Sequence, residues 1–326
     1  MKNFWTTLVR PIMALAPMAD VTDPAYRRII AKYSKQSVLN PGLAQFVMWT
    51  EFVSADGLAR APEEGRQKLL AELQYSEAER PIVAQFFTSN PEHMEQAAAR
   101  AAELGFDGVD INMGCPDKSI EKQGAGAAHI KNPTLAKEVI AAAKQGAKDL
   151  PVSVKTRLGY NKDELDTWLP HILSTGVAAV TIHARTRKEM SLVPARWERV
   201  ARAVEIRNDL APDTLILGNG DVTDVAHARQ LVEETGSDGA MLGRAIFGNP
   251  WLFAPAAPSL EDKLKVMVEH TKLYEQLLPH KSFSIMKKHY KAYVNGFDGA
   301  ADLRAKLFEC NNADEVKIVV DKFFTA

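Results

Sequence analysis

The stretch Gly108-Val-Asp-Ile111, followed by Asn112, is a short apolar run that ends in a polar residue. The chain repeats this pattern eight times, each run ending in a polar, glycine or proline residue, with 24 to 43 residues between successive end residues. The other runs are Ile12–Ala16 before Pro17, Phe46–Thr50 before Glu51, Ile82–Ala84 before Gln85, Val152–Val154 before Lys155, Val180–Ile182 before His183, Leu215–Gly218 before Asn219 and Ala240–Leu242 before Gly243. Each interval leaves room for a helix that returns the chain. Eight such units predict an α/β fold, a closed (β/α)₈ TIM barrel, whose chemistry lies at the carboxyl ends of its strands.

Helical patterns lie between these runs. Residues 91–104 are rich in Ala and Glu, Asn90 can cap their first turn, and Gly105 can end the helix. Two further helical patterns open at Asn132 and at Thr223. An open doubly wound sheet would show similar local patterns, and the count of eight units favours the barrel.

The barrel pattern finishes well before the end of the chain, which at 326 residues is longer than one barrel of about 250 residues. Ala254-Pro-Ala-Ala-Pro258 has the composition of a stiff linker, and the pattern from Ser259 onward is helical. We therefore expect a catalytic barrel domain over residues 1–254 and a small all-helical domain of about four helices over residues 259–326. Within the barrel, Asn40-Pro41-Gly42 predicts a turn before the second strand.

Composition narrows the class of protein. A hydrophobic content of 46% and a charged content of 25% are ordinary for a globular protein, and a net charge of −1 means that a nucleic-acid partner would need a local basic patch. Cys115 and Cys310 fall in different predicted domains, and the eight histidines show no HExxH or comparable spacing, so we expect no disulfide framework and no metal. The start resembles no signal peptide, and no run reaches the roughly 18 apolar residues of a membrane span. We expect a cytoplasmic, unanchored chain, and we take it to be a monomer.

The loops after the seventh and eighth strands carry the signature of an anion site. Gly218-Asn219-Gly220-Asp221 and Gly243-Arg244-Ala245 occupy the places where many barrels bind a phosphate. Glycines let backbone N–H groups approach an anion, and Arg244 adds a positive charge. The alternative is that these glycines only make tight turns. Two adjacent loops and an arginine favour phosphate binding.

Lys155 ends the fifth strand, and a lysine directed into a barrel mouth needs an anionic or polarised partner. Beside a phosphate-anchored cofactor it could stabilise the negative charge of a reduced flavin. The alternative is an ion pair with Glu51 at the same rim. Gln85 and His183, which also end strands, could supply hydrogen bonds to a planar heterocycle.

Cys115 lies three residues beyond the fourth strand, on a loop that contains glycine and proline. A free thiol has a pKa near 8.5, so at neutral pH it can donate a proton. A nucleophilic cysteine would need a neighbouring histidine or helix N-terminus that lowers its pKa, and the local sequence offers no such histidine. We favour a general acid over a nucleophile or an inert buried cysteine.

Several segments together resemble the tRNA-dihydrouridine synthase family. The matching segments are Ala16-Pro-Met-Ala-Asp-Val-Thr-Asp23, Thr50-Glu51, Gln85, Asp110-Ile-Asn-Met-Gly-Cys-Pro116, Val154-Lys-Thr-Arg-Leu-Gly159, Ile182-His-Ala-Arg-Thr-Arg187, Gly218-Asn-Gly-Asp221 and Gly243-Arg244. They follow one another in the family's order from about Ile12 to Phe253. The chain departs from the family at Asp20, where glycine is more usual, and at His129-Ile130, where two aliphatic residues are more usual.

The resemblance implies an FMN-dependent barrel with a C-terminal helical domain that helps to bind tRNA. The residues that would hold FMN, many through their main chain, are Pro17, Met18, Ala19, Gln85, Lys155, His183, Asn219, Gly220, Asp221, Gly243 and Arg244. Asn112 and Arg185 would face the target uracil, and Cys115 would be the general acid. NADPH would reduce FMN, flavin N5 would pass hydride to uracil C6, and Cys115 would protonate C5. The uracil would have to be extruded from the folded tRNA to reach the flavin.

The helical tail offers a local basic patch for such an RNA. Its basic residues are His280, Lys281, Lys287, Lys288, His289, Lys291, Arg304 and Lys306, interleaved with Phe283, Tyr290 and Tyr293. We single out Lys287, Lys288 and Lys291 for phosphate contacts and expect the aromatic residues to pack the helices. Two alternatives remain open: an FMN barrel that acts on a free pyrimidine, and a non-catalytic RNA-binding protein.

Overall fold

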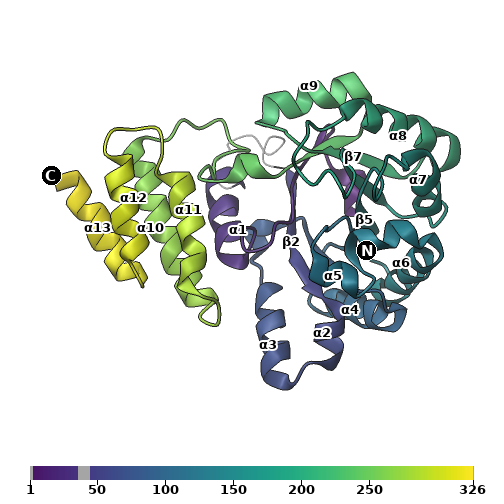
Figure 1. The fold of residues 1–326 in the computed structure, drawn as a ribbon, viewed down its shortest axis with the longest axis horizontal. Coiled ribbons are helices and arrows are strands. Elements are labelled where there is room, and N and C mark those ends of the chain that lie inside the picture. Colours follow the sequence, from purple (N-terminus) through teal and green to yellow (C-terminus); the bar gives the residue numbers. More distant parts are fainter. Residues whose placement is uncertain (1–2, 36–44, 326) are drawn as a thin grey trace.

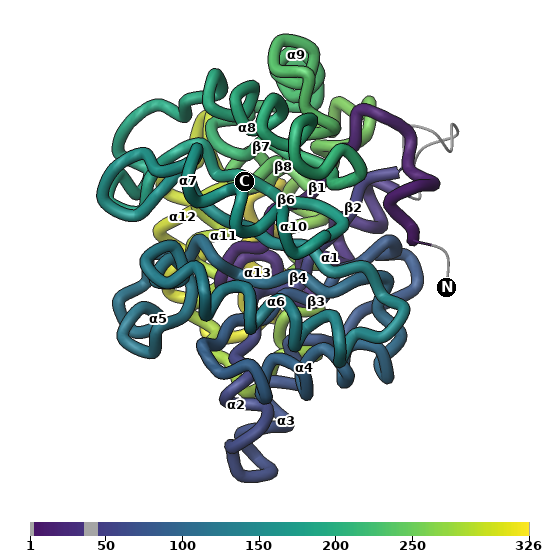
Figure 2. Tube along the Cα trace, turned by 90° about the vertical axis from the view of Figure 1, so that its right-hand side faces the viewer, coloured from purple at the N-terminus to yellow at the C-terminus, as the bar shows by residue number. Residues whose placement is uncertain are grey.

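The computed structural model describes residues 3–35 and 45–325, and within them eight parallel strands close into a barrel in sequence order, β1 to β8. The strands are β1 (Ile12–Leu15), β2 (Phe46–Ser54), β3 (Ile82–Phe87), β4 (Gly108–Met113), β5 (Val152–Arg157), β6 (Ala179–His183), β7 (Leu215–Asn219) and β8 (Gly239–Leu242). Closure is made by β1 and β8, where Leu15 is paired with Leu242. The predicted (β/α)₈ barrel is confirmed (Figure 1; Figure 2).

Helices cover the outside of the barrel. They are α1 (Pro24–Ile30), α2 (Ala55–Arg60), α3 (Glu63–Glu72), α4 (Pro91–Glu103), α5 (Lys118–Lys122), α6 (Pro133–Ala147), α7 (Leu165–Leu173), α8 (Trp197–Leu210) and α9 (Val225–Thr235). Short helical turns are η1 (Phe4–Thr7), η2 (Ala31–Lys35), η3 (Glu77–Glu79), η4 (Gly126–Lys131) and η5 (Arg244–Ile246). The predicted caps Asn90 and Asn132 accept backbone N–H groups of α4 and α6. The third helix starts one residue later than predicted, because Asp224 rather than Thr223 caps α9.

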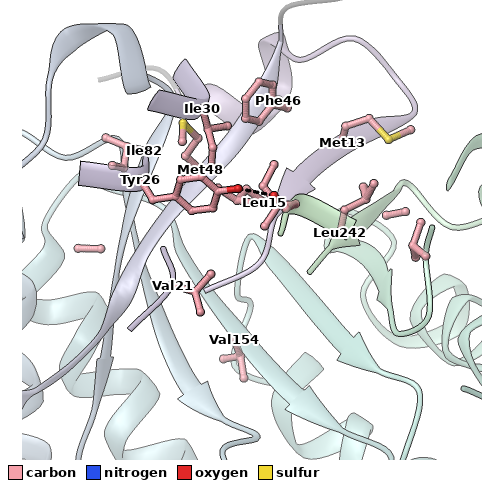
Figure 3. Packing of buried hydrophobic residues seen from close by; sticks show 14 of the residues in the cluster. Met13, Leu15, Val21, Tyr26, Ile30, Phe46, Met48, Ile82, Val154 and Leu242 are labelled. Carbon is pink, nitrogen blue, oxygen red and sulfur yellow. Dashed lines mark hydrogen bonds between the residues drawn. The ribbon is translucent and has the colours of Figure 1, made fainter. Parts of the chain in front are cut away.

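Alternate strand residues point into the barrel, as the period of two along a strand requires. Ile12, Ala14 and Trp49 belong to an inner apolar cluster, which Trp5 of η1 completes. The rings of Trp5 and Trp49 lie 5.9 Å apart. The apolar residues that alternate with them, Leu15 among them, pack in the main core with α1 residues such as Tyr26 (Figure 3). The lumen is therefore a packed core.

Four strands, β2 to β5, run two or more residues beyond their predicted ends, and β2 does so with an irregularity. The apolar run suggests an end at Thr50, but β2 continues to Ser54. The pairing with β3 shifts between Trp49 and Phe52, which is the signature of a bulge. Glu51 lies within this irregular stretch. The turn predicted at Asn40-Pro41-Gly42 lies outside the described residues.

A buried ion pair fastens α1 to η3. Arg27 donates from Nε to Glu79 Oε2 at 2.8 Å, and both side chains are 0% exposed. The two terminal nitrogens of Arg27 donate to the carbonyl oxygens of Thr22 and Gln74 at 2.7 and 2.6 Å. Such a pair is sensitive to the loss of one partner, because the other charge then stays buried without compensation.

Helices without strands follow the barrel and lie together on one side of it (Figure 1). They are α10 (Leu260–Leu277), η6 (Phe283–Ile285), α11 (Met286–Tyr293), α12 (Ala300–Glu309) and α13 (Ala313–Thr325). The group contacts the barrel through α1, where the Tyr26 and His270 rings stack with their centroids 4.6 Å apart. Tyr290 and Tyr293 are buried, so the predicted packing role of these aromatic residues is confirmed. Among the described residues, no helix is long and apolar enough to cross a bilayer.

Candidate active site

A cavity of about 260 Å³ opens at the carboxyl ends of the strands. Its walls include nearly all of the predicted site residues: Pro17, Met18, Asn112, Cys115, Lys155, His183, Arg185, Asn219, Gly220, Asp221, Gly243 and Arg244. Seven further residues complete the lining: Ala16, Phe52, Gly114, Pro116, Arg157, Ser191 and Val222. Two predicted cofactor residues, Ala19 and Gln85, are not among the lining residues.

Gln85 lies beneath the cavity rather than at its edge. The side chain is 0% exposed because β3 continues two residues beyond it. Its Nε2 donates to Asp110 Oδ2 at 2.6 Å, and Ser153 Oγ donates to Asp110 Oδ1 at 2.5 Å. Gln85 Oε1 accepts from Asn112 Nδ2 at 3.2 Å. These residues of β3, β4 and β5 form a polar floor that fixes the orientation of Asn112.

Asn112 in turn holds the loop of Cys115. Its Oδ1 accepts the backbone N–H groups of Gly114 and Cys115 at 3.1 and 2.9 Å. On the other side of the loop, the Cys115 carbonyl accepts the N–H of Ala127 at 2.9 Å. Gly126 has a φ of +61°, and a Cβ there would come within 2.7 Å of the Cys115 carbonyl oxygen. Only glycine permits this close approach.

The Cys115 thiol is suited to donate a proton rather than to attack. Burial raises the pKa of the Cys115 thiol above its ordinary value, while the backbone N–H of Asp117 and then the charges of Arg157 and Lys155 oppose the shift. A raised pKa keeps the sulfur protonated at neutral pH. A nucleophilic cysteine requires the opposite shift. The role of Cys115 as a general acid stays a prediction, and the direction of this shift is compatible with it.

Lys155 faces the cavity from β5, and its ammonium donates to Asn219 Oδ1 at 3.2 Å. Burial, then the charge of Arg157, lowers the pKa of Lys155 to about 8. The alternative of an ion pair between Lys155 and Glu51 is wrong, because Glu51 instead binds Lys281, with Nζ 3.1 Å from Oε2. Lys155 is therefore directed at the space where a ligand would lie.

A chain of polar contacts links the ends of β6 and β7. His183 Nε2 lies 3.0 Å from Arg185 Nη1, and Arg185 also donates to the Val193 carbonyl oxygen at 2.6 Å and to the Asp221 carboxylate. The other oxygen of Asp221 receives Arg244 Nη2 at 2.5 Å. Burial, with the positive charge of Lys155 next in size, lowers the pKa of His183 well below its ordinary value. A neutral His183 can accept from Arg185, as the geometry requires.

The glycines in the loops after β7 and β8 differ in whether the structure requires glycine at their positions. A Cβ on Gly218 would come within 2.1 Å of the Trp197 ring, so Gly218 exists to accommodate that tryptophan. Trp197 Nε1 donates to the Gly220 carbonyl oxygen at 2.9 Å, and Gly220 has a φ of +125°. At Gly243 a Cβ would lie 3.6 Å from its nearest neighbours, which is ordinary contact. Gly218 and Gly220 thus have turn and packing roles, the alternative noted from the sequence.

A second polar cluster lies on the rim beside the C-terminal helices. Lys281 Nζ lies 2.9 Å from Glu72 Oε2 and 3.6 Å from Asp20 Oδ1, in addition to its contact with Glu51. Although burial opposes it, the charges of Glu51 and Glu72 raise the pKa of Lys281. Asp20 has a φ of +53°, a left-handed conformation that glycine adopts most easily. Its Oδ2 lies 3.8 Å from Lys288 Nζ.

The structure divides the predicted basic patch. His289 is fully buried, which corrects its assignment to an RNA-facing surface. His280 and Lys281 have side chains 18% and 15% exposed and are paired with acidic residues of the barrel. Lys287 and Lys288 are half-buried, and Lys291 is exposed. The three lysines singled out for tRNA thus have access to solvent.

Arg157 and Phe52 are site residues that the sequence pattern does not single out. Arg157 Nε donates to the Gly114 carbonyl oxygen at 2.7 Å, and its Nη1 donates to the Met190 carbonyl oxygen at 2.9 Å. It thereby joins the Cys115 loop to the loop after β6. The sequence could have indicated Arg157 as a cavity residue, because it lies two residues beyond Lys155 on the same strand and such residues share a face. Phe52 could not be predicted as a cavity residue, because the bulge in β2 shifts the register before it.

A closed parallel barrel with a cationic, thiol-bearing cavity at its carboxyl rim defines a TIM-barrel enzyme. A family model described as "Dihydrouridine synthase (Dus)" matches residues 14–326. The chain therefore belongs to the dihydrouridine synthase family.

Curated relatives match over nearly their full length. The chain is 38% identical to a "Probable tRNA-dihydrouridine synthase 2" of Bacillus subtilis (strain 168), covering 99% of this chain and 97% of that protein. It is 37% identical to a "Probable tRNA-dihydrouridine synthase" of Staphylococcus aureus (strain MRSA252), covering 99% and 96%.

Solved structures share the barrel at low sequence identity. Morphinone reductase superposes with a TM-score of 0.51 at 15% identity, covering 74% of this chain and 84% of that chain. Histamine dehydrogenase from Rhizobium sp. 4-9 gives a TM-score of 0.53 at 11% identity, covering 80% and 48%. These likenesses show the fold alone.

Proposed function

We propose that this chain reduces the C5–C6 double bond of a uridine in tRNA to give dihydrouridine, with bound FMN as cofactor and NADPH as reductant. Membership of the dihydrouridine synthase family supports the reaction, and the names of the curated relatives support tRNA as its substrate. The observation that carries the proposal is that the thiol of Cys115 and the ammonium of Lys155 line the same cavity at the carboxyl ends of the strands. Residues 1–254 form the catalytic part in this proposal, and residues 259–326 help to bind tRNA.

The residues of the cavity fit an anionic cofactor. Lys155, Arg157, Arg185 and Arg244 all raise the positive potential that His183 experiences. Arg244, whose side chain is 66% exposed, is steered by Asp221 toward the rim at the end of β8. The phosphate of FMN would be held there, and Lys155 would face the negative charge of the reduced ring.

The chain's own residues supply positioning and the proton. Bound FMN, once reduced, supplies a hydride. Asn112 is fixed by Gln85, and beyond the hydrogen bonds described above it keeps one amide N–H for the uracil edge. The Cys115 thiol donates its proton to C5 of the extruded base. Arg185, which is held by Asp221 and the Val193 carbonyl, retains N–H groups that can bind the substrate.

The direct test supplies purified protein with NADPH and an unmodified tRNA transcript. We expect yellow protein that contains FMN, and dihydrouridine in the digested tRNA by mass spectrometry, with no product when NADPH is omitted. Free uracil and uridine serve as controls and should not turn over. Colourless protein that still binds tRNA, or equal turnover of free uracil, would contradict the proposal.

The affinity for FMN should fall as the pH rises above about 8. Burial lowers the pKa of Lys155 to about 8, so the side chain is charged below that pH and neutral above it. Because a bound anion favours the charged form, the logarithm of the binding constant should fall with a slope approaching −1 per pH unit above the pKa. Titration by quenching of FMN fluorescence measures this. The Lys155→Met variant should bind more weakly and without that slope, and the same slope in both proteins would remove Lys155 as its source.

Reversal of charge at Lys287, Lys288 and Lys291 should weaken tRNA binding. Removal of one phosphate contact reduces the slope of log K against log salt by roughly 0.7–0.9. Lys288 is already near Asp20, so the triple variant should change the slope by less than three full contacts would. Filter binding at several salt concentrations gives both the affinity and the slope.

A matched variant tests whether this patch differs from the rest of the surface. It reverses Lys265, Lys272 and Lys317, which are exposed lysines of α10 and α13, and so removes the same number of positive charges. Its affinity for tRNA should fall much less. Equal effects of the two triple variants would mean that the chosen patch is ordinary surface.

A further inference from the structure

Three side chains that are far apart in the sequence meet where the C-terminal helices pack on the barrel. Asp23 precedes α1, His270 lies in α10 and His289 lies in α11, and these helices are neighbours at this contact (Figure 1). Each of the three residues is 0% exposed. Each offers one ligand atom, and these atoms all lie within 4.8 Å of one another. None of the three lines the cavity described above.

The polar atoms of this cluster have few protein partners. Asp23 Oδ1 accepts the backbone N–H of Tyr26 at 2.9 Å, but Oδ2 has no hydrogen-bond partner among the described residues. Within the same part of the chain, both ring nitrogens of His270 lack a partner, and those of His289 make no hydrogen bond of good geometry, although the Asp20 backbone lies near the ring. Buried polar atoms are nearly always paired, so three such residues that bring one ligand atom each within 4.8 Å of the others call for an explanation.

Burial favours the neutral form of all three side chains: it holds both imidazoles in the form that binds metals, and burial, then the charge of Glu51, raises the pKa of Asp23 to about 7, so an ion would displace a proton there. Burial, and then the neighbouring His289, lowers the pKa of His270 well below its ordinary value. Burial, and then the charge of Lys288, lowers the pKa of His289 to about 3, against a smaller opposing effect of the Asp20 backbone. The ring centroids of His270 and His289 lie 4.6 Å apart at an interplanar angle of 80°.

We propose that Asp23, His270 and His289 bind a divalent metal ion, with Zn²⁺ as the best fit, and that this ion fastens α10 and α11 to the barrel. Two imidazoles and one carboxylate are donors that Zn²⁺ accepts. Donor distances of about 2.0–2.2 Å place tetrahedral ligand atoms roughly 3.3–3.6 Å apart, so the side chains have to approach by about an ångström. The expectation of no metal rested on local histidine spacing, and this cluster is assembled only by tertiary contact. The three protein ligands leave the fourth position of a tetrahedral ion to a water molecule, and their full burial between the helices favours a structural role.

The metal itself is the first test, made on untagged full-length protein so that no affinity tag supplies histidines. After reconstitution with ZnCl₂ and removal of unbound ions, mass spectrometry should find about one Zn²⁺ per chain. Relative to chelator-treated protein, the midpoint of thermal unfolding should rise by roughly 5 °C or more, because the ion binds only the folded state. Substoichiometric zinc together with an unchanged midpoint would overturn the proposal.

Variants then locate the ion. Asp23→Asn retains a side-chain oxygen that can cap α1, and His289→Gln keeps a polar side chain of similar length. Both should lose most of the zinc while they keep their flavin. The control is His129→Gln in η4, where a buried histidine binds the Thr88 carbonyl oxygen, and it should keep one ion per chain. Equal zinc in all three variants overturns the assignment. If a variant does not fold, X-ray absorption spectroscopy of the zinc-loaded wild type tests the same assignment. Sulfur in the coordination shell would contradict the proposed ligands, which supply only nitrogen and oxygen.

Discussion

Replacement of Cys115 by alanine is expected to reduce dihydrouridine formation by about 10²–10⁴ while FMN binding and its reduction by NADPH continue. The physical reason is that, in the proposed mechanism, the thiol donates the proton at this face of the cavity, and burial raises its pKa. The alanine side chain fits the same loop, because Asn112 holds that loop through backbone N–H groups. Single-turnover assays with reduced enzyme and tRNA measure the affected step.

Two matched variants sharpen this result. Cys310→Ala removes the other cysteine, which is buried in the C-terminal helices, and should leave the rate unchanged. Cys115→Ser replaces the thiol with a much weaker acid and should remain close to Cys115→Ala. An active Cys115→Ala enzyme would remove this residue from the mechanism and leave the family assignment intact.

Loss of one partner of the ion pair between Arg27 and Glu79 should have the largest effect on stability. Arg27→Met leaves a carboxylate that is 0% exposed without its cation, and such a loss costs about 3–5 kcal/mol in the free energy of unfolding. It also removes the donors to the carbonyl oxygens of Thr22 and Gln74. Chemical denaturation followed by circular dichroism measures the change.

The double variant Arg27→Met/Glu79→Leu separates charge from packing. It removes both charges, so it should recover a large part of the lost stability. Arg66→Met serves as the surface control, because Arg66 pairs with exposed Glu63 and should contribute less than about 1 kcal/mol. A double variant no more stable than Arg27→Met would show that the backbone contacts of Arg27 dominate.

Much of the fold could be predicted because each barrel strand corresponds to a short apolar run in the sequence. Six of the eight apolar runs are followed by a residue that lines the cavity, and this register predicted that Lys155, His183 and Asn219 lie together. The prediction was wrong at the end of β2, where a bulge shifts the pairing between Trp49 and Phe52. A bulge has no strong local pattern, so Phe52 as a wall of the cavity could not be foreseen.

Other parts of the site depend on contacts between distant segments. Gln85 was predicted to end its strand, but β3 continues to Phe87, and nothing local shows that Asp110 and Ser153 hold its side chain in the floor. In the same way, His289 has basic neighbours in sequence but lies inside the contact with α1. Periodicity predicts which face of a helix is buried, whereas the partner on the opposite element comes only with the fold.

The left-handed conformation of Asp20 affects how the barrel and the C-terminal helices are held together. A non-glycine residue in this conformation carries some backbone strain, which aspartate tolerates better than most residues. In this chain the same residue presents its carboxylate to Lys281 and Lys288. The backbone strain is confined to this turn, whereas the two charge contacts of the carboxylate connect the barrel to the C-terminal helices. A relative with glycine here would have a relaxed turn but would lack both charge contacts between the barrel and the C-terminal helices.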